Sequence, residues 1–292
     1  MKGSDFTAKL WLTCPAGWTI SKGMLKRRLI PSLLVRDGKI VQSVQFKHTN
    51  VIGNAFTAVD FFNAWAVDEI LILDISREHT GREEFFHIVE ELSERCFVPL
   101  SVGGWITTIA DIEELLGRGA DKVAINTHAF RHPEFVMEAA RVFGSQCIVV
   151  SIDVRRHGSG RHVVWIDRGR ENTGRSATDW AKEAQQRGAG EILLTSIDND
   201  GMRKGYDLEL MSEVCKAVEI PVIAFGGVGD WQHLVEGVNI GHVDAVSAGN
   251  IFHYTEHSTK KAKEFMRDKG VPVRDTVFYK VSLPRRPRYK QY

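Results

Sequence analysis

Carboxylates that directly follow apolar runs are the first residues of this chain whose type and position could do chemistry. Asp153 ends one such run, in "VVSIDVRRHG", and Asp74 ends another, in "EILILDIS". A buried strand does not tolerate an ionised carboxylate unless that group is solvated, hydrogen-bonded or used in proton transfer. A near-copy of the first segment, "IPSLLVRDG", places Leu34 where Asp153 stands. Two matched strands could each supply a carboxylate for general acid–base chemistry. Here only one of them does, and the candidate is Asp153.

Two glycine-rich turns, "SIDNDG" and "AFGGVG", follow later apolar runs. Glycine lets backbone N–H groups approach an anion closely, and the start of a following helix adds a favourable field. Any tight turn after a strand also favours glycine, but barrels often bind phosphate with their last loops. The residues expected at this anion site are Thr195, Asp200, Gly201, Gly226, Gly227, Gly249 and Asn250.

The earlier segments "SVGGW" and "AINT" offer an equivalent anion site at Gly104, Asn126 and Thr127. Internal alignment places Trp105 on Gly227. An indole in the position of a glycine would fill the space that a phosphate needs; alternatively, Trp105 points elsewhere and the loop has another shape. The sequence leaves both open, and one strong anion site rather than two is expected.

Four charged residues stand at the beginning of apolar runs: Arg28, Glu69, Lys122 and Glu191. The amino-terminal ends of parallel strands meet at one end of a barrel, so these side chains should converge on its bottom opening. The conventional interpretation is a stabilising network of ion pairs. Two acids and two bases around an axial opening could also form a gate.

Short apolar runs alternate with amphipathic segments from residue 29 onward, which is typical of parallel strands covered by helices. Eight such strands in roughly 250 residues favour a single closed α/β barrel of the (βα)8 TIM type over an open sheet. Strands are expected at 29–35, 69–75, 98–102, 122–126, 147–153, 191–197, 221–224 and 245–248, and helices at 83–96, 109–118, 133–142, 177–187, 208–218 and 231–238.

The barrel is also predicted to be an internal duplication of two half-barrels. "DEILILDIS" resembles "GEILLTSID", "VPLSVGGW" resembles "IPVIAFGG", and "ADKVAIN" resembles "VDAVSAG". Strand–helix units always share some features, but matching Pro, Gly-Gly and Asp positions in the same order favour duplication.

The composition is that of an ordinary globular protein, with 43% hydrophobic and 26% charged residues and a formal net charge of +1. The near-neutral net charge gives no reason to expect nucleic acid as a partner. A membrane is not expected either, since no apolar run reaches the ~20 residues that span a bilayer. Four scattered cysteines indicate reduced thiols in a cytoplasmic protein, and no metal or cofactor is expected. The expected organisation is an extension or leader at 1–23, the barrel at 24–274 and a basic tail at 275–292.

Between residues 24 and 274 the segments "KRRLIP", "GADKVAIN", "FGSQCIVVSID", "RGAGEILLTSIDNDG" and "GYDLEL" resemble the cyclase subunit of imidazole glycerol phosphate synthase. The resemblance implies a barrel docked through its bottom face on a glutaminase, and we expect Asp121, beside Lys122, to belong to that face. Ammonia would pass an ammonia gate formed by Arg28, Glu69, Lys122 and Glu191 and travel up the axis. At the top, two aspartates would close an imidazole ring on a substrate with two phosphate ends.

The chain departs from this family pattern at the cyclisation end. Asp153 matches one of the two catalytic aspartates, whereas Leu34 stands in place of the other. Gln42 takes the place of a lysine in the first loop, Trp105 replaces the third glycine of a phosphate loop, and Phe225 replaces a serine. The losses gather at the top, while all four gate positions match.

Three functions are consistent with this pattern. The first is a diverged paralogue that receives ammonia from a partner glutaminase for amidino- or amino-sugar (surface polysaccharide) biosynthesis. It would pass the ammonia to a third amidotransferase or acceptor protein, or to a phosphorylated small molecule at its own top face. The second is a genuine cyclase of histidine biosynthesis whose first loop supplies another acid, and the third is a phosphate-binding scaffold without an ammonia role. Leu34, Gln42 and Trp105 favour the first over the second.

Overall fold

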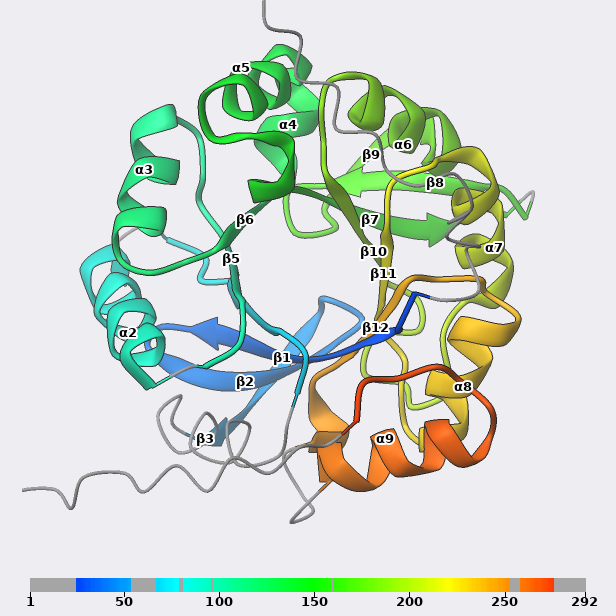
Figure 1. Cartoon of the computed structure of the whole chain (residues 1–292). Helices are drawn as coiled ribbons and strands as arrows, with labels where there is room; N and C mark the ends of the chain where they lie inside the picture. The colour runs from blue at the N-terminus through cyan, green and yellow to red at the C-terminus, as the bar shows by residue number, and fades with distance from the viewer. Residues whose placement is uncertain are drawn as a thin grey trace, which may run out of the picture.

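The computed structural model describes residues 25–53, 67–78, 81–95, 97–158, 160–252 and 258–275. Within these ranges the chain forms a closed ring of eight parallel strands surrounded by helices (Figure 1). The predicted (βα)8 barrel of the TIM type is confirmed. The expected extension at 1–23 lies outside the described residues, as does the expected basic tail except for Asp275.

The barrel strands follow one another around the ring in chain order. They are β1 (Arg28–Arg36), β4 (Ile70–Asp74), β5 (Leu100–Gly103), β6 (Lys122–Ile125), β7 (Ile148–Arg156), β10 (Glu191–Ser196), β11 (Val222–Phe225) and β12 (Ala245–Ala248). The ring closes because β1 pairs with β12, where Arg28 faces Ala245, and β7 pairs with β10, where Asp153 faces Thr195. Helices cover the outer face of these strands, which explains their nearly continuous apolar sequence.

The outer helices are α2 (Arg82–Arg95), α3 (Ile109–Gly117), α4 (Thr127–Arg131), α5 (Pro133–Phe143), α6 (Ala177–Gln186), α7 (Leu208–Ala217), α8 (Trp231–Asn239) and α9 (Ser258–Asp268), with short 3-10 turns η3 (Ser145–Cys147) and η4 (Asn250–Phe252). Side-chain caps start several of them: Thr108 and Asp111 form a capping box at α3, and Asp207 accepts the N–H of Leu210 at α7. Such caps satisfy N–H groups that have no partner within the helix. None of the described helices combines the length and apolar character that crossing a membrane requires.

Two antiparallel hairpins that were not predicted from the sequence extend from the first strand of each half-barrel. β2 (Lys39–Val44) pairs with β1 and with β3 (His48–Gly53), and β8 (His162–Ile166) pairs with β7 and with β9 (Glu171–Ser176). Equivalent extensions after β1 and β7 agree with the internal duplication. Asp37 and Gly38 form the first turn at φ 50° and 72°, which is the geometry of a type I′ hairpin.

Buried apolar side chains form two separate clusters. The larger lies between strands and helices and includes Phe85, Leu92 and Ile112. The smaller consists of Ile30, Leu34, Val41, Leu71, Ala124, Val149, Leu193, Ile223, Phe225 and Ala245. Because these residues come from the barrel strands and β2 and are distinct from the helix-facing cluster, they fill the inside of the barrel.

A buried ion pair fastens helix α9 to the amino-terminal end of the barrel. Lys263 Nζ lies 2.8 Å from Asp68 Oδ1, and both side chains are 1% exposed. Asp68 Oδ2 also accepts the backbone N–H of Leu29 at 2.8 Å. Asp68 directly precedes Glu69, so the segment that anchors α9 also supplies a charged side chain to the bottom opening.

Removing the Lys263 ammonium should destabilise the fold, because the buried carboxylate of Asp68 would then keep only the more distant Arg274, at 4.0 Å, as a cationic partner. In urea titrations Lys263→Met is expected to lower the free energy of unfolding by ~3–5 kcal/mol. The control is Lys260→Met on the same helix, where the side chain is 32% exposed and its ammonium lies 3.7 Å from Glu264. That change should cost less than ~1 kcal/mol, and equal losses would contradict a special role for the buried pair.

Candidate functional site

Four charged side chains form a closed ring, the charge ring, at the amino-terminal end of the barrel. Arg28 lies 2.5 Å from Glu69 and 3.0 Å from Glu191, and Lys122 lies 3.0 Å from both carboxylates. The hydroxyl of Ser101 donates a further hydrogen bond to Glu69 at 2.6 Å. Each cation bridges both acids, so the ring has no unpaired member.

Burial and charge pairing act in opposite directions on the charge ring. Burial alone would raise the pKa of Glu69, but Arg28 and Lys122 outweigh it and hold that pKa below its usual value. Burial would also lower the pKa of Arg28, but Glu191 and Glu69 outweigh it, and the pKa is raised. Glu69 and Arg28 therefore stay ionised at neutral pH.

The surface around the charge ring presents charged and apolar groups together. Asp121, next to Lys122 in the chain, is exposed, and its Oδ2 accepts the N–H of Leu100 at 2.8 Å. Leu25 precedes β1, Phe97 precedes β5 and Ile240 follows α8, and their exposed fractions are 56%, 66% and 53%. Segments that lead into strands lie at the amino-terminal end of a barrel, so these side chains share that end.

Asp153 lies enclosed near the opposite end of the barrel. The Nδ2 of Asn126 donates to its Oδ2 at 2.8 Å, and the side chain of Thr195 is hydrogen-bonded to it as well. Burial raises the pKa of Asp153 to about 7, although these hydrogen bonds oppose the rise, and the charge of Asp200 adds to it. A carboxyl group that titrates near neutrality suits general acid–base catalysis.

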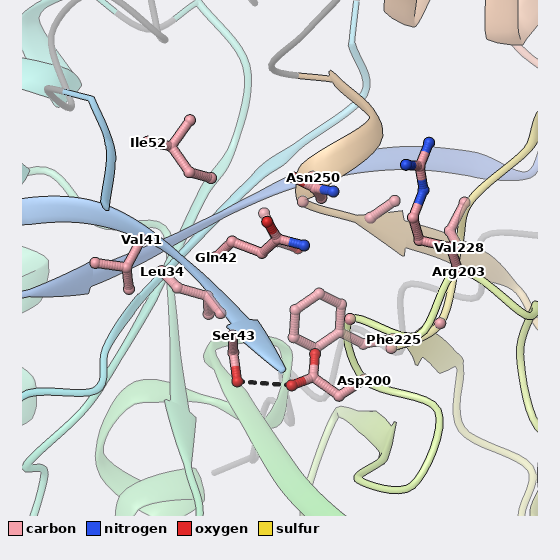
Figure 2. Close-up of a pocket in the computed structure, with 16 residues that line it drawn as sticks. Leu34, Val41, Gln42, Ser43, Ile52, Asp200, Arg203, Phe225, Val228 and Asn250 are labelled. Atoms are coloured by element: carbon pink, nitrogen blue, oxygen red, sulfur yellow. Dashed lines mark hydrogen bonds between the residues drawn. The ribbon is translucent and has the colours of Figure 1, made fainter. Parts of the chain in front are cut away.

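A pocket opens at the carboxyl-terminal ends of β1, β10, β11 and β12 (Figure 2). The residues of the expected anion site that line it are Asp200, Gly201, Gly226, Gly227, Gly249 and Asn250. The Oδ1 atom of Asn250 is buried and has no hydrogen-bond partner among the described residues. Thr195 differs from this group because it contacts Asp153 rather than the pocket.

Close backbone contacts hold the loops of the pocket in place. A Cβ atom at Gly201 (φ 71°) would lie 2.4 Å from the carbonyl oxygen of Ser43, and one at Gly227 (φ 106°) would lie 2.1 Å from that of Gly205. Only glycine fits these positions. The hydroxyl of Ser43 donates to Asp200 Oδ2 at 2.6 Å, and burial raises the pKa of Asp200 despite this bond.

Apolar side chains line the pocket where the family resemblance implies polar ones. Leu34 and Phe225 belong to the inner apolar cluster and also face the pocket. Gln42, from β2, extends toward the middle of the lining side chains (Figure 2). Asp37, the next acid after Leu34 in the chain, is 72% exposed at the β1–β2 turn and does not line the pocket.

The equivalent residues of the first half-barrel do not join this pocket. The carbonyl of Gly104 accepts a hydrogen bond from Arg82 Nη1 at 2.8 Å, and the hydroxyl of Thr127 accepts the N–H of Asp167 at 2.9 Å. Asp74 Oδ1 accepts a backbone N–H two residues further along the chain at 2.9 Å. The structure therefore divides the expected anion-binding residues into two groups.

Several residues that line the pocket were not predicted from the sequence, among them Ser43 and Arg203. Ser43 binds Asp200, and Arg203 lines the pocket beside Val228 (Figure 2). The Asp-Gly pair before β2 is a hairpin signal that would have placed Ser43 on a strand. Arg203 lies in a turn at φ 59°, and nothing in its sequence context marks it.

These features define an α/β barrel with a pocket and an enclosed carboxyl group at the carboxyl-terminal ends of its strands, and a ring of ion pairs at the other end. A family model described as histidine biosynthesis protein matches residues 28–258, well over half of the chain. The chain belongs to the histidine biosynthesis protein family. This match and the closed barrel fit a barrel of the cyclase type.

The carboxyl group of Asp153 should titrate near neutrality. Carbon-13 NMR is expected to show an aspartate resonance with a midpoint at about pH 7 that Asp153→Asn removes. Because this pKa lies above the usual 3.8, the folded protein keeps a proton that the unfolded chain has released. Stability should therefore fall between about pH 4 and 7, by at most ~1.4 kcal/mol per pH unit from this group, and level off above that range.

Asp153→Asn should lack this part of the pH dependence, because the amide does not ionise. Asp179→Asn is a suitable control, since that carboxylate lies at the exposed surface in the first turn of α6, where it accepts the hydroxyl of Ser176 at 2.6 Å. A midpoint below about pH 5 for Asp153 would contradict the enclosed site.

Proposed function

We propose that this protein is the ammonia-receiving barrel subunit of a glutamine-dependent amidotransferase complex. A partner glutaminase docks on the amino-terminal face, and its ammonia enters through the charge ring. The acceptor is a phosphorylated small molecule in the pocket or a third protein at that end, in amidino- or amino-sugar biosynthesis for surface polysaccharides. The observation that carries the proposal is the closed ring of ion pairs on the barrel axis.

The charge ring contributes less to stability than its number of ion pairs suggests. Buried ion pairs often return little net stability compared with apolar groups of similar volume. Apolar side chains such as Ile30, Leu71 and Leu193, two residues further along their strands, fill the same barrel. The charges therefore support a role beyond packing, and a gate for a small molecule fits their position.

The inner apolar cluster supports the passage of neutral ammonia rather than ammonium. A cation that moved past Leu71, Val149 and Leu193 would lose its hydration without gaining a partner, whereas neutral ammonia loses much less. A sealed docking face is needed to keep that ammonia from bulk solvent. The exposed Leu25, Phe97 and Ile240 support such docking, since partners cover exposed apolar surface.

The presence of Leu34 in place of a catalytic aspartate supports the proposal that the ammonia acceptor differs from the usual cyclase substrate. A positioned acid–base group contributes about 10²–10⁴-fold to a rate, and a leucine cannot exchange a proton. Phe225 and Gln42 change the same pocket. We therefore propose that imidazole ring closure is weak or absent.

A second candidate function is ring closure in histidine biosynthesis. Family membership and the pKa of about 7 at Asp153 favour it. It requires an acid from another part of the chain to replace the one missing at Leu34. Complementation of a histidine auxotroph that lacks the cyclase subunit separates the two candidates, since only a working cyclase restores growth.

Removal of one charge from the ring should uncouple glutamine hydrolysis from amination. In the complex with its glutaminase, Lys122→Met and Glu191→Gln are expected to lower glutamine-dependent product formation about tenfold or more. Product formation from added ammonium salts should stay within about twofold, because that ammonia reaches the acceptor from solvent.

The matched control is Lys216→Met in the last turn of α7, which removes an exposed ammonium outside the ring. It should leave both activities unchanged. Equal losses with glutamine and with ammonium in the ring variants would contradict the gate. If the barrel neither binds nor stimulates a glutaminase encoded beside it, the phosphate-binding scaffold replaces this proposal.

Leu34→Asp tests whether one missing carboxylate explains the proposed loss of ring closure. We expect less than about a tenfold gain in imidazole formation from ammonium salts, because Gln42, Trp105 and Phe225 differ as well. Leu34→Asn is the control, since it adds a polar group of the same size that cannot exchange a proton. Wild-type turnover comparable to that of a standard cyclase would contradict the proposal.

A further inference from the structure

The turns that follow β5 and β11, at the carboxyl-terminal end of the barrel, have similar backbone conformations but carry different side chains. Gly104 and Gly226, which are equivalent in the internal repeat, both have positive φ, 116° and 91°. The next residue is Trp105 at φ 57° in the first half and Gly227 at φ 106° in the second. A left-handed conformation is strained for a residue with a Cβ atom. Trp105 therefore takes a glycine turn and adds a large side chain to it.

The turn between β8 and β9 lies against this tryptophan. The guanidinium carbon of Arg168 is 5.2 Å from the centroid of the Trp105 ring, and its Nη1 donates to the carbonyl of Ser76 at 2.8 Å. The N–H of Asp167 donates to the hydroxyl of Thr127 at 2.9 Å. These contacts tie the hairpin turn to the loops that follow β4, β5 and β6.

The same contacts place the β8–β9 turn over the position that an anion would occupy in the first half-barrel. Thr127 is equivalent to Asn250, which lines the pocket and carries an amide NH2 group that can donate to an anion. In the first half the Thr127 hydroxyl is bound by the hairpin, and Asn126 donates to Asp153. The first-half position thus contains a segment of the chain itself.

The guanidinium of Arg168 is engaged by neighbouring protein groups and so does not form a binding site for a second anion. Its guanidinium stacks on Trp105, donates to the carbonyl of Ser76 and lies 3.5 Å from the carboxylate of Asp167. The same carboxylate lies 2.8 Å from Arg170. The donors of Arg168 are therefore directed at protein groups around the turn.

We infer that the β8–β9 turn and Trp105 permanently occupy the first-half anion subsite, so that the pocket accepts a small molecule with a single phosphate group. The phosphate lies at Gly226, Gly227 and Asn250. The rest of the ligand extends over Leu34 and Phe225, whose apolar side chains favour an uncharged group beside them. The inference rests on the anion pocket of the proposed function and excludes ligands with two phosphate ends.

The experiment is a titration with inorganic phosphate, followed by backbone amide NMR of the full chain. In the wild type, Gly226, Gly227 and Gly249 should shift along one binding curve, while Gly104 and Thr127 do not move. In the double variant Trp105→Gly/Arg168→Gly, both groups should shift, and the second dissociation constant should lie within about tenfold of the first. Arg170→Gly is the control, because it removes an equal charge from the same turn and leaves Trp105 covered.

The outcomes distinguish occupation of the first-half subsite from anion binding in the pocket. Shifts at both groups in the wild type would overturn the inference and leave the pocket intact. A double variant that melts as a folded protein but still binds one phosphate would overturn it as well. Absence of shifts at Gly226 and Gly227 would reject the anion pocket itself and the inference with it, while the charge ring would remain open to the ammonia experiments.

Discussion

Closure of the parallel sheet is the constraint on which the rest of the structure depends. Pairing of β1 with β12 and of β7 with β10 leaves none of the eight described barrel strands with an unpaired edge. Closure also fixes which residues face inward, because side chains alternate along each strand. Arg28 and Ile30 therefore point to the axis in successive layers, and so do Glu191 and Leu193. The charge ring and the pocket are consequences of this single geometric requirement.

The two ends of the barrel differ in how fully their polar groups are satisfied. At the amino-terminal end each charge of the ring has partners of opposite sign. At the mouth, Asp153 holds a proton near neutrality and Asn250 keeps an unpartnered oxygen among the described residues. Satisfied networks make a structure rigid, whereas unsatisfied polar atoms raise its energy until a ligand binds. The carboxyl-terminal end of the barrel is therefore the end at which ligand chemistry is expected.

Sequence patterns predicted the barrel strands, in which successive side chains are buried. Strands covered on both faces read as unbroken apolar runs, and the charges at their amino-terminal ends were sufficient to predict that Arg28 and Glu191 approach each other. The Asp37-Gly38 pair signals the turn between β1 and β2, but the turns between β2 and β3 and between β8 and β9 carry few standard signals. Gln45 and Phe46, as well as Asp167 and Arg168, adopt left-handed conformations without being glycine. The contact between Arg168 and Ser76 joins residues 92 positions apart, and no local pattern records it.

The inner apolar cluster keeps the charge ring and the pocket from sharing a hydrogen-bond partner. Leu71, Ala124 and Val149 lie between them, and these side chains have no polar atoms through which one end could pull on the other. Substitution energies at well-separated sites without common partners add independently. Changes at the mouth should thus leave the energetics of the ring untouched. In evolution, substitutions could therefore change the pocket at one end of the barrel while the charge ring at the other end is retained.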